Sequence, residues 1–338
     1  MCKTKKMKKI QLGISGLGRI GKIHVQNVQR NSASAVIKAA YHTNPNSKDL
    51  AQLQGVTHFY DEYKELIEDP AIDAIIIASP TAVHAEQIIL AAKAGKAIFA
   101  EKPIDLNREK VNEVVRVLEE TKVPFFLAFN RRFDPSVEDI KKTIVEGKIG
   151  TPEIIKVISR DPAPPPLAYI PSSGGLFLDM AIHDFDMAFH LMNQEVVQVY
   201  STGTVFGDSE IKKLDDIDTA MTTLTFANGA IAVIDNSRHA AYGYDQRIEV
   251  FCSKGLCGMD NQRINQSYTA DSKGKHMAIP SYFFIERYEA SYQREMDLFL
   301  DCLLQNKPQP VGAIDGLRAL NIALAAQQSV KENRVVEL

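Results

Sequence analysis

Short apolar runs alternate with helical repeats of apolar residues over the first 130 positions of the chain. The runs of strand length occupy residues 10–15, 36–42, 72–79, 97–100 and 124–129, and the helical repeats occupy residues 81–94 and 107–120. Because residues 74–78 contain no polar position, they predict a central strand that is buried on both faces. This order of elements predicts a parallel sheet covered by helices.

The pattern changes after Gly150, where segments rich in Val, Ile, Thr and aromatic residues favour a mainly antiparallel sheet. These segments occupy residues 153–160, 196–206, 219–227, 230–237 and 247–252. Asn228-Gly229 predicts a tight hairpin, because both residues tolerate a positive φ. Helical periodicity returns in residues 284–305 and 316–331. We therefore predict two α/β domains, residues 1–125 and residues 126–338.

The composition is that of an ordinary globular protein, with 45% hydrophobic residues, 24% charged residues and a formal net charge of -3. The broad basic excess of a nucleic-acid-binding protein is missing, and no apolar run approaches the roughly 20 residues that cross a bilayer. Residues 1–9 predict a solvated tail, because no apolar region of a signal peptide follows them. The cysteines Cys2, Cys252, Cys257 and Cys302 form no CxxC pair. We expect a cytoplasmic protein with reduced thiols and a small-molecule partner.

A glycine-rich motif, Gly16-Leu17-Gly18-Arg19-Ile20-Gly21, follows the first predicted strand and opens a helix. Gly16 suits a tight turn, Gly18 lets the backbone approach a pyrophosphate, and Gly21 allows close packing of helix on strand. The motif predicts a Rossmann dinucleotide-binding domain, with a glycine-rich turn that holds no ligand as the alternative.

The position that usually binds the adenosine ribose of NAD through an acid lies about 20 residues further on. It reads Tyr41-His42-Thr43-Asn44, without an acid and without an arginine that would bind the phosphate of NADP. His42 or Asn44 can still hydrogen-bond a ribose hydroxyl. We predict NAD as the cofactor, and NADP remains possible.

Two further motifs carry residues for proton transfer. In Glu101-Lys102-Pro103, at the end of a strand, the lysine can reach a substrate hydroxyl and the proline can form a cis bond. The alternative is a solvated surface lysine. On a helix, Asp179 and His183 would share one face with Asp186, and a carboxylate beside an imidazole suits a general base. The alternatives there are a surface ion pair and half of a zinc site.

Taken together, the three motifs resemble the glucose-fructose oxidoreductase, inositol dehydrogenase and MocA family over nearly the whole chain. Within that family, residues 159–166, 173–186, 236–238 and 242–247 are similar to bacterial inositol 2-dehydrogenases. The resemblance implies an N-terminal Rossmann domain, a C-terminal α/β domain with a large open sheet, substrate between the two, and a homotetramer. It also implies that Lys102, Asp179 and His183 are catalytic. The residues expected to bind cofactor are Gly16, Gly18, Arg19, Ile20, Gly21, His42, Ser79, Thr81, His84, Glu101 and Lys102.

The resemblance assigns substrate contacts to Arg160 and Tyr244, beside the three catalytic residues, and no metal ion. The expected reaction is oxidation of a secondary hydroxyl of myo-inositol to the inosose, with hydride transfer to NAD. The alternatives are scyllo-inositol or another cyclic polyol or sugar as substrate. More remote alternatives are a glycosidase that uses NAD transiently, a non-catalytic sensor with the same fold, and a zinc-assisted enzyme.

Overall fold

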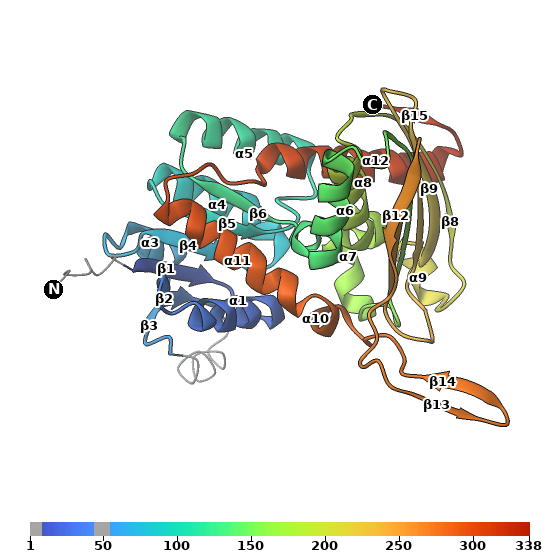
Figure 1. Cartoon of the computed structure of the whole chain (residues 1–338). Helices are drawn as coiled ribbons and strands as arrows, with labels where there is room; N and C mark the ends of the chain where they lie inside the picture. The colour runs from blue at the N-terminus through green and yellow to red at the C-terminus, as the bar shows by residue number, and fades with distance from the viewer. Residues whose placement is uncertain (1–8, 44–54) are drawn as a thin grey trace. The chain divides into compact units, whose positions relative to one another are not determined.

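The computed structural model describes residues 9–43 and 55–338 of the chain (Figure 1). Residues 1–8 of the predicted tail, with Cys2, and Asn44 lie outside the described residues. The chain divides into two compact units. Unit 1 runs up to Asn130 and also contains Ala290–Leu317, and unit 2 contains Arg131–Glu289 and Arg318–Leu338.

Unit 1 is built on a six-stranded parallel sheet with the strand order β3-β2-β1-β4-β5-β6. Its strands are β1 (Ile10–Ser15), β2 (Ala35–Tyr41), β3 (His58–Tyr60), β4 (Ala74–Ile77), β5 (Ala97–Glu101) and β6 (Phe125–Ala128). The predicted central strand β4 is confirmed, because it lies between β1 and β5 and all four of its residues are buried. The strand order is that of a dinucleotide-binding Rossmann fold, as predicted.

Unit 1 also contains the helices between these strands and one helix from later in the chain. They are α1 (Arg19–Arg30), α3 (Tyr63–Glu68), η1 (Thr81–Val83), α4 (His84–Lys93), α5 (Arg108–Thr121) and, from later in the chain, α11 (Glu289–Leu304). The short elements β3 and α3 were not predicted, because three and six residues are too few for a clear periodic pattern.

The segment Ala290–Leu317 packs in unit 1, whereas the predicted boundary placed it in the second domain. Phe299 of α11 contacts the rings of Phe99 and Phe126, at centroid distances of 5.4 and 6.1 Å. The backbone N–H of Leu127 also donates to the carbonyl of Val311. A helical repeat shows that one face is buried, but it does not show which domain buries that face.

Unit 2 contains a seven-stranded sheet with the order β12-β11-β7-β10-β9-β8-β15, in which only the β10–β7 pair is parallel. Its strands are β7 (Pro152–Arg160), β8 (Val196–Thr204), β9 (Thr219–Phe226), β10 (Ile231–Ser237), β11 (Asp245–Cys252), β12 (Gly255–Met259) and β15 (Val336–Glu337). The predicted hairpin joins β9 to β10, and within it Gly229 takes a positive φ of 86°. A separate exposed hairpin, β13 (Tyr268–Asp271) and β14 (Gly274–Met277), projects from this unit (Figure 1).

The helices of unit 2 leave one face of this sheet open (Figure 1). They are η2 (Asn130–Phe133), α6 (Pro135–Val145), η3 (Leu167–Tyr169), α7 (Ile170–Ser173), the π-helix η4 (Leu176–Ala181), α8 (Ile182–Met192), α9 (Glu210–Lys213), α10 (Phe284–Arg287) and α12 (Ala313–Glu332), whose residues up to Leu317 belong to unit 1. The open face carries Tyr200, Met221, Ile231 and Phe251, which are 39 to 47% exposed. The predicted open, mainly antiparallel sheet is therefore confirmed.

Neither a membrane-crossing helix nor a cysteine bridge is found in the described part of the chain. No helix there combines the length and the apolar character that a membrane span requires. Cys252, Cys257 and Cys302 are free thiols.

Candidate active site

The glycine-rich loop joins β1 to α1, and two of its glycines are required by close packing. Gly16 has a φ of +94°, and a Cβ on it would lie 2.4 Å from the carbonyl oxygen of Ala78. A Cβ on Gly21 would lie 2.1 Å from the carbonyl oxygen of Gly16. Only glycine fits these two positions without a shift of the backbone.

Gly18 differs, because the protein itself does not require a glycine there. Its φ is -68°, and a Cβ on it would meet nothing within 4 Å. Gly18 is also the N-cap residue of α1, so the first helical turn, which contains Arg19 and Ile20, begins beside this open space. The loop therefore fits a pyrophosphate that approaches the backbone at Gly18 and is held by the helix N-terminus.

His42 lies directly after β2 and contacts the glycine-rich loop. The backbone N–H of Leu17 donates to Nδ1 of His42 over 3.3 Å. Burial, followed by the positive charge of Lys22, lowers the pKa of His42 below its ordinary value. The ring is therefore neutral at physiological pH, and Nε2 remains to donate to a ribose hydroxyl.

Three predicted cofactor residues follow β4, and their contacts differ. Ser79 donates from Oγ to Gln87 over 2.8 Å, and Thr81 begins the short helix η1. His84 is buried, and both of its ring nitrogens face carbonyl oxygens, Nε2 at 2.7 Å from Ser79 and Nδ1 at 2.9 Å from Pro103. His84 thus joins the ends of β4 and β5, and its ring leaves no nitrogen for the predicted cofactor contact.

Glu101 and Lys102 stand at the carboxyl end of β5. Glu101 is buried, and its Oε1 lies 2.8 Å from Nε2 of His24 on α1, so one carboxylate oxygen is bound by the protein. Lys102 is partly exposed, and the bond that follows it, Lys102–Pro103, is cis. The carboxyl ends of the strands are the edge at which an open α/β sheet binds its ligands.

In unit 2, Asp179 and His183 lie on one continuous helical segment, as predicted, but its first part is a π-helix. Asp179 belongs to η4 and His183 to the first turn of α8. The segment begins after Gly175, which has a φ of +80° and approaches the Asp216 carboxylate so closely that a Cβ would lie 2.5 Å from Oδ1. That oxygen accepts a hydrogen bond from the N–H of Leu176 over 2.9 Å.

A buried arginine holds the Asp179 carboxylate. Arg238, only 1% exposed, lies 3.3 Å from Oδ2 of Asp179 through one guanidinium nitrogen and 3.0 Å from Oδ2 of Asp216 through another. The hydroxyl of Tyr169 lies 3.3 Å from the other Asp179 oxygen. Asp179 is thereby held in a fixed position beside a positive charge. No role was predicted for Arg238 beyond its place in residues 236–238, a segment similar to the inositol 2-dehydrogenases.

Asp186, which the helical spacing places near Asp179 and His183, has a structural partner. Its carboxylate pairs with Nε and Nη2 of Arg132, at 2.8 and 2.5 Å, and both side chains are buried. A two-point contact of this kind fixes α8 to the segment before α6, and breaking a buried pair by removing one partner costs about 3 to 5 kcal/mol.

The predicted substrate contact of Arg160 is not supported by its position. Ser159 faces the interior of unit 2, where its Oγ contacts Arg131 and Gln246. Arg160 is the next residue of the strand and points to the opposite face, where Asp235 and Tyr242 bind it. Side chains alternate along a strand, so the structure does not bring Arg160 together with Asp179 and His183.

Tyr244, a predicted substrate contact, is only 3% exposed and lies in the interior of unit 2. Its hydroxyl accepts from Arg131 over 3.3 Å, and its ring packs edge-on against Tyr288. Burial raises the pKa of Tyr244 well above its ordinary value. Arg131 in turn pairs with Asp184 of α8 at 2.5 Å. Tyr244, Arg131 and Asp184 therefore form a buried polar network.

Asp161, directly after β7, is a titratable residue of unit 2 that the sequence did not single out. Burial raises its pKa to about 6, although the positive charges of Arg131 and Arg238 oppose this rise. Asp179 is among the charges that act on it. The position of Asp161 at a strand end was the one signal in the sequence that could have identified it.

Both parts of the chain match known protein families. Residues 10–129 match the oxidoreductase family described by its NAD-binding Rossmann fold, and residues 137–257 match the GFO/IDH/MocA C-terminal domain. The chain is 46% identical over 325 residues to the uncharacterized oxidoreductase YrbE of Bacillus subtilis, which covers 96% of this chain and 95% of that protein. It is 43% identical over 329 residues to the myo-inositol 2-dehydrogenase of Thermotoga maritima, with coverage of 97% and 98%.

Among solved structures, the fold is similar to that of the scyllo-inositol dehydrogenase from Lactobacillus casei, which was solved with bound NAD(H) and scyllo-inositol. The TM-score is 0.91 at 32% sequence identity, and the match covers 98% of this chain and 99% of that chain.

Proposed function

Because the chain belongs to the GFO/IDH/MocA family of NAD-binding oxidoreductases, we propose that it is an inositol 2-dehydrogenase that oxidises a secondary hydroxyl of myo-inositol to the inosose. The observation that carries this proposal is the segment with Asp179 and His183, in which buried Arg238 holds the carboxylate four residues before the imidazole. scyllo-Inositol is the second candidate substrate, since the Lactobacillus casei relative was solved with it.

Alcohol oxidation needs a base for the hydroxyl proton and a group that stabilises the developing alkoxide. In this proposal, His183 accepts the proton and Asp179 orients its ring and stabilises the imidazolium. Lys102 donates a hydrogen bond to the hydroxyl oxygen and favours its anionic form. Bound NAD supplies the hydride acceptor. The remaining task of the protein is to position these groups. The contact of Arg238 with Asp179, and that of His24 with Glu101 beside Lys102, contribute to this positioning.

Two observations support NAD as the cofactor. They are the open space at Gly18 and the neutral ring of His42. A neutral residue at position 42 removes one source of repulsion toward the 2′-phosphate of NADP, so the discrimination between the two cofactors is expected to be moderate. Ser79 and Thr81 are proposed to contact the cofactor from the end of β4.

We further propose that the protein is a cytoplasmic homotetramer. The exposed apolar residues on the open sheet face of unit 2, such as Met221 and Ile231, support self-association. The free thiols of Cys252, Cys257 and Cys302 fit a reducing compartment. Light scattering on a size-exclusion column tests the assembly, and a monomeric mass at micromolar concentration would contradict it.

The function is tested by incubating the purified protein with NAD or NADP and with myo-inositol, scyllo-inositol or glucose, while following the fluorescence of the reduced nicotinamide. Background is low because the chain contains no tryptophan. His183→Ala, purified in parallel, controls for dehydrogenases of the expression host. Reduction with an inositol by the wild type alone supports the proposal. If no inositol led to reduced nicotinamide while NAD still bound, the result would contradict the proposal and favour a glycosidase or a sensor.

A further inference from the structure

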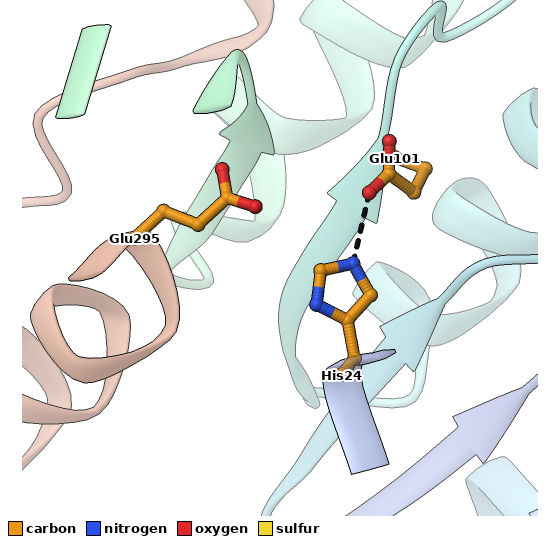
Figure 2. A group of neighbouring side chains, drawn as sticks. All are labelled: His24, Glu101 and Glu295. Carbon is orange, nitrogen blue, oxygen red and sulfur yellow. Dashed lines mark hydrogen bonds and ion pairs between the residues drawn. The ribbon is translucent and has the colours of Figure 1, made fainter. Parts of the chain in front are cut away.

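Three ionisable side chains from distant parts of the sequence meet in the interior of unit 1. They are His24 of α1, Glu101 at the end of β5 and Glu295 of α11, and Figure 2 shows their polar ends turned toward one another. One nitrogen or oxygen from each lies within 4.8 Å of the others, and all three residues are buried. Neither the nucleotide-binding loop nor the proposed proton transfer uses Glu295.

The orientation of His24 is fixed by its neighbours. Its Nε2 lies 2.8 Å from a carboxylate oxygen of Glu101, an acceptor, so Nε2 carries the proton. The ring packs edge-on against Phe99 and Tyr292, at centroid distances of 4.9 and 6.1 Å. Because aromatic side chains fix the ring, the donated hydrogen bond defines where the Glu101 carboxylate lies.

Glu295 is the unusual member of the cluster. It is 0% exposed, and neither of its carboxyl oxygens has a hydrogen-bond partner. An ionised carboxylate in such a place would bear a desolvation cost of several kcal/mol with no compensating contact. Burial, followed by the negative charge of Glu101, raises the pKa of Glu295 well above its ordinary value. The titratable groups gathered here are His24 from α1, Glu101 from β5, and Glu295 with Tyr292 from α11.

We propose that Glu295 is an uncharged carboxylic acid that donates its proton toward the Glu101 carboxylate, and that this cluster positions the adjacent Lys102. A protonated carboxyl group needs only one acceptor, and a carboxyl oxygen of Glu101 lies within 4.8 Å of one of Glu295. The proposal includes the rotation of the Glu295 side chain that closes this gap. Glu101 then accepts from two donors, His24 on one side and Glu295 on the other. One negative charge, shared by two carboxyl groups, remains in the interior.

The consequence for Lys102 follows from its two neighbours in the chain. Glu101 precedes it and is bound by His24, while the carbonyl of Pro103 follows it and accepts from His84 over 2.9 Å. The backbone of Lys102 is therefore held on both sides by buried histidines. Glu295 touches neither substrate nor cofactor in this proposal. It is a positioning residue, and its role in catalysis rests on the proposed function of Lys102.

Glu295→Gln and Glu295→Leu test the proposal, with Asp301→Asn, an exposed acid on the same helix, as the control. Glutamine is uncharged and can donate an N–H to Glu101, whereas leucine cannot. We expect Glu295→Gln to keep the wild-type kcat and Glu295→Leu to lower kcat about 10-fold, with the Kd for NAD changed by less than about twofold in both. The labelling rate of Lys102 by an amine-reactive ester, read by mass spectrometry, should change several-fold in the leucine variant only.

A second measurement reports the charge of Glu295 without any turnover. A carboxyl group whose folded pKa is raised contributes stability that is complete below its unfolded pKa of about 4.3 and is lost as the pH rises toward the folded pKa. The wild type should therefore lose Tm relative to Glu295→Gln as the pH rises from about 5 to 9. Asp301→Asn should show no such trend.

The outcomes separate this inference from the proposed function. If the wild type oxidises no inositol, the proposed function fails, while the thermal and labelling experiments still decide the role of Glu295. The inference is overturned if the Tm difference between Glu295→Gln and the wild type stays constant from about pH 5 to 9, or if Glu295→Leu leaves both kcat and Lys102 labelling unchanged. A divalent cation found at one per chain in the purified wild type and lost in Glu295→Gln would also overturn it, since the cluster would then be a metal site.

Discussion

Gly18 allows a direct test of how the nucleotide-binding loop works, because alanine fits the protein there but should not fit the complex. The residue has a φ of -68°, and a Cβ would meet no protein atom within 4 Å. Gly18→Ala therefore introduces no backbone strain. Alanine lowers the conformational entropy of the unfolded chain, which stabilises the folded protein by about 0.4 to 1 kcal/mol. Alanine is also a poorer N-cap than glycine, which offsets this gain by a similar amount. The Tm should change by no more than about 4 °C.

The effect on NAD should be much larger. The added methyl group would occupy the space through which a pyrophosphate approaches the backbone, and we expect the Kd to rise about 10- to 100-fold, which corresponds to about 1.4 to 2.8 kcal/mol. Gly312→Ala is the matched control, because Gly312 also precedes a helix and a Cβ on it would meet nothing within 4 Å. Gly21→Ala is the opposite case, since its Cβ would lie 2.1 Å from a backbone oxygen. It should lower stability by about 1 to 3 kcal/mol.

Isothermal titration with NAD and thermal unfolding by circular dichroism, on the same preparations, separate the two effects. Gly18→Ala should lose affinity at nearly constant Tm, and Gly312→Ala should keep both. If Gly18→Ala bound NAD within about twofold of the wild type, the pyrophosphate would not approach this residue, and the loop geometry would need another explanation.

Four further predictions concern the proposed site and the stability of unit 2. His183→Ala should lower kcat about 100- to 10,000-fold with NAD affinity retained, and unchanged turnover would remove His183 from the role of base. Lys102→Ala should cause a similar loss in the same assay, whereas a full rate would identify an ordinary surface lysine. His42→Asp should weaken turnover with NADP more than with NAD, because a carboxylate repels the additional phosphate, and equal effects on both cofactors would place the ribose elsewhere. Burial is the main cause that lowers the pKa of His190 to about 3. The neutral ring therefore contributes its full stability above the unfolded pKa of about 6.5, and this stability is lost as the pH falls from about 6.5 toward 3. His190→Gln should therefore reduce the fall in Tm between about pH 7 and 4, and an unchanged acid profile would refute this assignment.

The sequence by itself determined the features that depend on neighbouring residues. The apolar run at residues 74–78 predicted the buried strand β4, and the spacing of Gly16, Gly18 and Gly21 after a strand predicted the nucleotide-binding loop. These predictions succeed because strand and helix periods, and the conformational freedom of glycine, are local properties of the chain.

Only the tertiary structure decided which distant residues meet. The periodicity of α11 predicted a buried face, but packing against Phe99 and Phe126 placed that helix in unit 1. Alternation along β7 separates Ser159 from Arg160, but only the packed sheet shows which of the two faces the interior. The approach of Glu295 to Glu101 at the end of β5, and the contact of Arg238 with Asp179, likewise join segments far apart in sequence. Such pairings depend on how the elements pack, and local patterns of polarity report burial without naming the partner.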